Sequence, residues 1–193
     1  MEISIQFLVR LGVIAASIIW GIWEQRLAIR NRRTAEGQVK DRGSFFRVYF
    51  SVPVGITVGS IFAFSGFGNL TCPIIWEVLG ILAAVLGFEI RLIAMRTLAH
   101  HFTHRVTILK DHVLIRDGLY RWIRHPSYLG QIIIMVGLGC ALANGFALIV
   151  TPIFTILAVL SRISTEERAL SEHFGTEYES YRRTTARLIP GIW

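Results

Sequence analysis

Five long apolar stretches constrain this 193-residue chain more than any other feature of its sequence. A helix that crosses the roughly 30 Å hydrocarbon core of a bilayer needs about 20 mostly apolar residues. Only 17% of the residues are charged, whereas soluble domains carry roughly 25%. The stretches lie at residues 3–23, 45–64, 72–94, 127–143 and 146–163. We therefore expect an all-α integral membrane protein with five transmembrane helices.

We expect one membrane domain over residues 1–193, because no Gly/Ser-rich, Pro-rich or acidic linker divides the chain. The first stretch differs from a signal peptide, since Arg10 lies inside it and no small-residue cleavage site follows it. It is therefore expected to remain as a permanent span. The two cysteines are too few for a disulfide framework.

The basic residues predict the orientation in the membrane. Six lie between the first and second spans, six between the third and fourth, and five from Arg162 onward, whereas the loops at 65–71 and 144–145 have none. Short loops rich in Lys and Arg stay in the cytoplasm. The N-terminus is thus expected outside and the C-terminus in the cytoplasm. This arrangement also accounts for the net charge of +7, so we expect no nucleic-acid partner.

The last two spans are expected to form a tight helical hairpin. Only Ala143, Asn144 and Gly145 separate them, which is a turn signal. An arm of 17 residues rises about 25 Å, so the two arms end at the same level. The segment entering the hairpin, 124–128, and the segment leaving it, 162–167, must then lie in one interfacial layer on the cytoplasmic side.

Two interpretations remain open for the polar residues of that layer. Arg124 and His125 fit simple anchoring of a helix end at the lipid headgroups. Arg162 and Glu166, spaced i and i+4, share a helix face and fit a local ion pair. Together, the same residues form a candidate polar pocket that lipid covers.

The remaining features also have more than one interpretation. Residues 165–183 are expected to form an amphipathic cytoplasmic helix, capped at Ser164/Thr165, with Ala169, Leu170 and Phe174 on its apolar face. His100 and His104 share a helix face, but no Glu or Cys completes a zinc motif, so no metal is expected. Six glycines suit either access of a lipid tail or close helix packing. They are Gly55, Gly59, Gly80, Gly87, Gly137 and Gly139.

A series of short motifs follows in a fixed order between about residue 95 and residue 190. They are Phe102-Thr103-His104, His112-Val113-Leu114-Ile115, Gly118-Leu119-Tyr120, Arg124-His125-Pro126-Ser127-Tyr128 with Gly130, Glu166-Glu167, Phe174-Gly175, Glu177-Tyr178, Tyr181 and Leu188-Ile189-Pro190. Each piece alone is weak, but their order and spacing are specific, and together they resemble the isoprenylcysteine carboxyl methyltransferases. This family lies within a wider group of integral membrane methyltransferases that includes phospholipid N-methyltransferases.

The resemblance implies a site for S-adenosylmethionine, the methyl donor, between segments 100–128 and 162–190. It also implies that Arg162 faces the substrate carboxylate, which makes Arg162 the catalytic and substrate-binding candidate. A further polar contact falls near Thr107, where the loop is shorter than the family pattern. The cofactor-binding candidates that the resemblance implies are His112, Val113, Leu114, Ile115, Tyr120, His125, Pro126, Ser127, Tyr128 and Glu166.

The residue types suit this chemistry. The donor needs a carboxylate near its cationic or hydroxyl groups, hydrogen-bond donors for its own carboxylate, and an apolar slot for its base. A carboxylate acceptor is itself the nucleophile, so it needs orientation by a guanidinium and no general base. No Gly-rich strand–helix turn of the soluble dinucleotide-binding type occurs here.

The resemblance leads to the expected function of carboxyl O-methylation of a C-terminal isoprenylcysteine, with a prenylated, membrane-embedded substrate. The active site is expected at the cytoplasmic side of a multi-pass protein, in either a bacterial inner membrane or an endoplasmic reticulum. Three alternatives remain open: a phospholipid amine N-methyltransferase, an isoprenoid or sterol reductase that uses a nicotinamide cofactor, and a non-catalytic membrane module.

Overall fold

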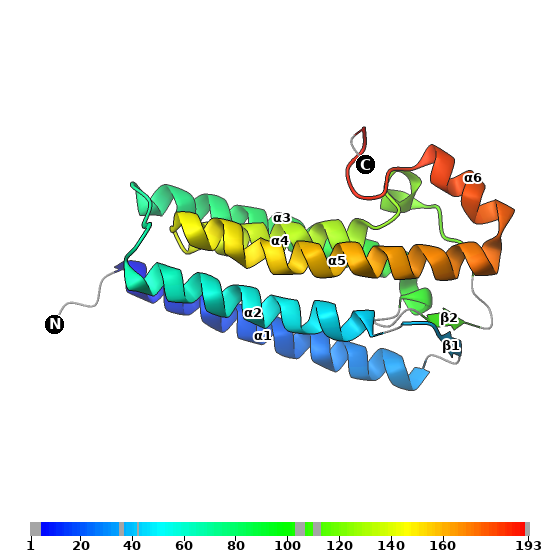
Figure 1. The fold of residues 1–193 in the computed structure, drawn as a ribbon, viewed down its shortest axis with the longest axis horizontal. Helices are drawn as coiled ribbons and strands as arrows, with labels where there is room; N and C mark the ends of the chain where they lie inside the picture. The colour runs from blue at the N-terminus through cyan, green and yellow to red at the C-terminus, as the bar shows by residue number, and fades with distance from the viewer. Residues whose placement is uncertain (1–4, 35–36, 42, 103–106, 110–112, 192–193) are drawn as a thin grey trace.

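The computed structural model describes residues 5–34, 37–41, 43–102, 107–109 and 113–191. Long helices lie side by side and run back and forth along the bundle (Figure 1). They are α1 (Ile5–Thr34), α2 (Ser44–Ser65), α3 (Pro73–Leu98), α4 (Pro126–Ala141) and α5 (Gly145–Phe174). The short helices η1 (Ala99–His101), η2 (Gly118–Arg121) and α6 (Thr176–Thr184) complete the helical elements of the described residues.

Four of these helices, α1, α2, α3 and α5, are long and apolar enough to cross a membrane. The fifth expected span, 127–143, corresponds to α4, which is apolar but has only 16 residues. The helical membrane architecture is therefore confirmed. The orientation, with the N-terminus outside, stays a prediction.

A small antiparallel sheet was not expected from the sequence. Strand β1 (Gly37–Val39) pairs with β2 (Thr107–Leu109), with Gln38 opposite Ile108. The sheet and α6 lie at the same end of the bundle (Figure 1). This end also contains the N-terminus of α4 and the last turns of α5, so it is the polar end of the molecule.

Helix α1 extends beyond the predicted span, and the predicted cap at Ser164/Thr165 is wrong. Helix α1 continues past residue 23 to Thr34, and α5 continues without a cap at Ser164/Thr165. The hydroxyls of Ser164 and Thr165 instead bond the carbonyls of Leu160 and Ser161, one turn earlier in the same helix. The break comes at Gly175, whose φ of 53° and ψ of −123° suit a residue without a Cβ. The expected helix 165–183 is thus the end of α5 followed by α6.

The α4–α5 hairpin is confirmed, and Asn144 fixes its turn. The Oδ1 atom of Asn144 accepts hydrogen bonds from the backbone N–H groups of Phe146 and Ala147, which caps α5. Its Nδ2 donates to the carbonyl of Phe67 at 2.8 Å and to Asn69 Oδ1 at 3.1 Å. One buried side chain therefore joins this turn to the α2–α3 loop.

Close backbone contact holds α3 against α4. A Cβ on Gly80 would lie 2.3 Å from the backbone nitrogen of Ala141, and one on Gly137 would lie 2.5 Å from that of Ala84. Gly87 and Gly130 meet in the same way one to two turns further along. Gly55, Gly59 and Gly139 pack near Thr151 of α5. All six glycines singled out in the sequence therefore serve close helix packing.

Candidate active site

The two ends of the hairpin meet as the arm lengths predicted. Tyr128, near the start of α4, donates its hydroxyl hydrogen to Glu166 Oε2 at 2.6 Å. Arg162 Nε donates to the same hydroxyl oxygen at 2.5 Å, and the guanidinium carbon lies 5.8 Å from the centre of the Tyr128 ring. The phenol thus lies between Arg162 and Glu166, where the sequence suggested a direct ion pair.

The buried Arg162 guanidinium also contacts residues just before and at the start of α2. Its Nη1 donates to Asp41 Oδ1 at 3.2 Å and to Ser44 Oγ at 3.3 Å. Asp41 is itself fixed, since its Oδ1 accepts from Ser44 Oγ at 2.8 Å and its Oδ2 from the Phe45 N–H at 3.1 Å. These contacts join segments separated by 121 positions in the chain.

Ser127 is held by an arginine from α3. Arg91 Nη1 donates to Ser127 Oγ at 2.8 Å and to its carbonyl at 3.1 Å. The other side of the same guanidinium makes a two-pronged pair with Glu24 of α1, at 2.7 and 2.9 Å. The Ser127 hydroxyl is therefore engaged within the protein, and Arg91 connects α1 and α3 to the start of α4.

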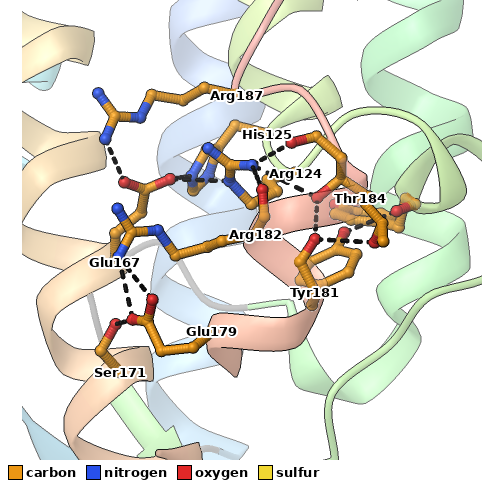
Figure 2. A network of polar contacts seen from close by, with 11 residues as sticks. Arg124, His125, Glu167, Ser171, Glu179, Tyr181, Arg182, Thr184 and Arg187 are labelled. Atoms are coloured by element: carbon orange, nitrogen blue, oxygen red, sulfur yellow. Dashed lines mark hydrogen bonds and ion pairs between the residues drawn. The ribbon is translucent and has the colours of Figure 1, made fainter. Parts of the chain in front are cut away.

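A second polar cluster surrounds Glu167 (Figure 2). This buried carboxylate accepts from Arg124 Nε at 3.0 Å and from Arg187 Nη2 at 2.6 Å, and it lies 3.4 Å from His125 Nε2. Buried carboxylates are stable only when such partners compensate their lost hydration. Glu167 therefore fixes the His125 ring, which stacks on Tyr128 with a centroid distance of 5.7 Å.

The segment after α6 returns to the start of α4 and completes the cluster. The backbone N–H groups of Arg124 and His125 donate to the carbonyls of Ala186 and Arg187, at 2.8 and 3.2 Å. Arg124 also donates to the carbonyls of Arg182 and Thr185. The residue pair that precedes α4 is thereby held by backbone and side chain together.

Two tyrosines outside the spans close the site from the side of η2. Tyr181 donates its hydroxyl hydrogen to the carbonyl of Tyr120 at 2.6 Å. Burial raises the pKa of Tyr181 to about 12. Burial, and after it the Glu166 carboxylate, raise the pKa of Tyr120 well above its usual range. Both phenols therefore stay protonated at physiological pH, and that of Tyr181 acts as a hydrogen-bond donor.

An apolar cavity of about 700 Å³ leads to Arg162. Its walls come mainly from α1, between Ile14 and Ile29, and from α2, between Phe45 and Thr57. The polar residues of its lining include Tyr128, Gln131 and Arg162, together with the Arg91–Glu24 pair. The cavity thus joins a long apolar compartment to a buried guanidinium.

Of the predicted site residues, the structure brings Tyr120, His125, Tyr128, Arg162 and Glu166 into one region. Pro126 is fully buried and begins α4, as its missing N–H favours. Val113 is exposed, whereas Leu114 and Ile115 are partly buried. His112 lies outside the described residues. Thr107 begins β2, and its side chain is not described.

Four other residues shape this region but were not among the predicted site residues. Asp41 and Gln131 were not singled out, Glu167 was only part of a matched motif, and Arg91 was expected only near the site. The ion pair between Arg91 and Glu24 could have been predicted from the sequence, because two opposite charges near the same end of two spans are costly unless they pair. Nothing local marks Asp41. In the part of the chain that the structure describes, no group of three His, Cys, Asp or Glu side chains is arranged to hold a metal.

Comparison with known proteins gives consistent results. The sequence pattern of the isoprenylcysteine carboxyl methyltransferase family matches residues 78–172. A protein-S-isoprenylcysteine O-methyltransferase of Saccharomyces cerevisiae is 42% identical over 118 residues, which are 60% of this chain and 49% of the yeast protein. One from Dictyostelium discoideum is 35% identical over 65% of this chain and 54% of its own length. The chain spans about half the length of these curated relatives.

A solved structure also resembles the chain. It is described as the eukaryotic intramembrane Ras methyltransferase, isoprenylcysteine carboxyl methyltransferase, without a monobody. The TM-score is 0.55 at 26% identity, over 78% of this chain and 50% of that one.

The fold and the site together define a class: a helical integral membrane protein with a buried cationic site at the end of an apolar cavity. Residues 78–172 carry the sequence pattern of the isoprenylcysteine carboxyl methyltransferase family, and the chain is similar to that family in this part.

Proposed function

We propose that this protein is a methyltransferase that uses S-adenosylmethionine to methylate the carboxylate of a lipid-linked acceptor, a C-terminal isoprenylcysteine being the nearest match. One observation carries the proposal: the lining of the mainly apolar cavity between α1 and α2 includes the buried side chain of Arg162. Such a cavity suits a molecule with a long apolar tail and one anionic end. The names of the relatives point to the same chemistry.

Arg162 orients the acceptor. A guanidinium binds a carboxylate through two parallel hydrogen bonds, which fixes both the position and the direction of its oxygens. The Tyr128 hydroxyl, at 2.5 Å from Arg162 Nε, fixes the guanidinium in turn. Orientation and exclusion of water account for most of the rate in such a transfer, and the buried setting of Arg162 provides both.

The methyl donor fits on the other side of Tyr128. Glu166 is partly exposed and supplies a carboxylate, His125 supplies a ring nitrogen, and the half-buried Leu114 and Ile115 supply apolar surface. Tyr120 supplies a protonated hydroxyl in the same region. S-adenosylmethionine brings a methyl carbon that its sulfonium already activates, so these residues only need to hold and align it. The acceptor carboxylate carries the electron pair, and no general base is required.

The polar end of the cavity argues against the nearest alternative. A phospholipid amine acceptor requires carboxylates or aromatic faces around a cation. The cavity lining does carry aromatic rings, but the Arg162 guanidinium lies among them and would repel a cationic headgroup, and the only lining carboxylate among the described residues, Glu24, is paired with Arg91. The site is proposed to lie at the cytoplasmic side of the membrane, because the basic segments cluster at that end.

The first test is isothermal titration of the detergent-solubilised protein with S-adenosylhomocysteine, the demethylated product of the donor. We expect micromolar binding that Glu166→Gln weakens at least about tenfold, since that change removes one carboxylate. NADPH serves as the control ligand. Binding of NADPH instead of S-adenosylhomocysteine would favour the reductase, and binding of neither would leave only a non-catalytic membrane module.

The second test is transfer of a radioactive methyl group to N-acetyl-S-farnesylcysteine in reconstituted vesicles. Incorporation as a base-labile methyl ester is the expected result. Incorporation into phosphatidylethanolamine, with none into the farnesylcysteine, would contradict the proposal and favour amine methylation.

A further inference from the structure

The residue proposed to hold the acceptor already contacts a carboxylate of the chain. Asp41 Oδ1 lies 3.2 Å from Arg162 Nη1, and the two side chains are only 8% and 5% exposed. Ser44 and the backbone of Phe45 hold both oxygens of Asp41 in place. Asp41 lies in the segment before α2, outside the residues matched by the family pattern. A carboxyl acceptor that reaches Arg162 therefore meets an anion beside it.

We propose that Asp41 is an internal competitor of the acceptor: it shares the Arg162 guanidinium with the acceptor carboxylate and so weakens binding of the acid but not of the ester product. This inference rests on the function proposed above. In chemical terms, Asp41 is a positioning residue, because it acts on the acceptor through Arg162.

The charge changes of the reaction explain why such a competitor is useful. A carboxylate oxygen forms a bond to the methyl carbon while the methyl–sulfur bond breaks, and the electron pair of that bond stays on sulfur. The carboxylate and the sulfonium both lose their charge, and no proton moves. An unshared guanidinium would therefore stabilise the charged acid more than the transition state, which lowers KM without raising kcat. Sharing with Asp41 reduces this ground-state stabilisation.

The same contact favours release of the product. The methyl ester is neutral and makes only a weak hydrogen bond to a guanidinium. Asp41 then regains the whole interaction with Arg162, and the ester leaves through the apolar cavity. The contact between Arg162 and Asp41 would thus be enough to distinguish the charged acid from the neutral ester.

The test compares the unsubstituted protein with its Asp41→Asn variant, in which the side chain keeps its shape and loses its charge. Binding is measured by titration with N-acetyl-S-farnesylcysteine and with its methyl ester, each in the presence of S-adenosylhomocysteine. We expect the variant to bind the acid about tenfold more tightly and the ester unchanged. In methyl transfer, KM and kcat should both fall, as expected when a ground state is stabilised.

Glu172→Gln is the matched control. Glu172 pairs with Lys40, the neighbour of Asp41, at 2.8 Å, in an exposed position. Its loss loosens the same segment without changing the charge at Arg162, so acid and ester binding should stay as in the unsubstituted protein. Weaker or unchanged acid binding in Asp41→Asn, or equal tightening for the ester, would overturn the inference.

A second measurement covers the case in which Asp41→Asn does not fold. The chain has three aspartates, Asp41, Asp111 and Asp117, so infrared difference spectra with carboxyl-labelled aspartate can be assigned from the two other variants. The acid, but not the ester, should shift the Asp41 carboxylate band, and no acid-specific shift would contradict the inference. If the unsubstituted protein binds neither acid nor ester, the proposed function fails first and this inference with it.

Discussion

The two sides of the helical bundle are packed in opposite ways. Helices α3 and α4 meet through Gly80, Gly87, Gly130 and Gly137, so that their backbones touch. Helices α1 and α2 face each other through large apolar side chains and enclose the cavity. The tight side holds the start of α4, and with it His125 and Tyr128, at a fixed height. The open side leaves space for a lipid. The tightly packed side thus positions the site residues, while the loosely packed side leaves room for a ligand to enter.

The largest expected effect comes from the tight side. Gly80→Ala places a methyl group 2.3 Å from the backbone of Ala141, so the two helices have to move apart. We expect a loss of about 3 kcal/mol of stability, measured as a lower apparent Tm in detergent. An unchanged Tm would mean that α3 and α4 are not held by backbone contact.

The next effect is a loss of activity expected from a change at Arg162, which lines the cavity on the open side. Arg162→Lys keeps the charge but removes the two-pronged geometry. We expect kcat/KM for methyl transfer to fall about a hundredfold, with S-adenosylhomocysteine binding within about twofold of normal. Full activity in radioactive transfer assays would show that the guanidinium geometry is not required.

Filling the cavity should affect only the acceptor. Val52 lines the cavity, and Val52→Trp occupies part of its volume. We expect KM for the acceptor to rise about tenfold while donor binding stays unchanged. The matched control is Val54→Trp, because Val54 is 42% exposed and is not among the lining residues. An equal effect of both changes would remove the cavity from the acceptor's binding site.

The smallest effect is expected at Gly21 of α1, which, unlike Gly80, has no close neighbour. A Cβ on Gly21 of α1 would meet no atom within 4 Å, and Ala favours a helix over Gly by about 1 kcal/mol. Gly21→Ala should therefore leave the Tm unchanged or raise it slightly, in the same thermal assay. A marked destabilisation would show that α1 packs as closely as α3.

Apolar length predicted where the spans lie because the bilayer sets that length. It did not predict where α1 and α5 end, since hydropathy falls where a helix leaves the hydrocarbon and not where its backbone hydrogen bonds stop. Helix α5 ends at Phe174, nine residues beyond Thr165 of the polar pair Ser164/Thr165 that had suggested a cap.

The site was predictable where it depends on the hairpin. Equal arm lengths were enough to bring His125 and Tyr128 near Arg162 and Glu166. The position of the Tyr128 hydroxyl between Arg162 and Glu166 depends on side-chain conformation, which periodicity does not describe. Asp41 was out of reach, because its contact with Arg162 spans 121 positions and no repeat or motif relates them.

The return of residues 185–187 to the start of α4 has a consequence for biosynthesis. The backbone bonds from Arg124 and His125 to Ala186 and Arg187 form only after that late segment has emerged from the ribosome. The candidate spans of the described residues precede it in the chain, so these helices can be inserted before residues 185–187 reach the start of α4. The backbone bonds that fix Arg124 and His125 are then made after insertion of these helices.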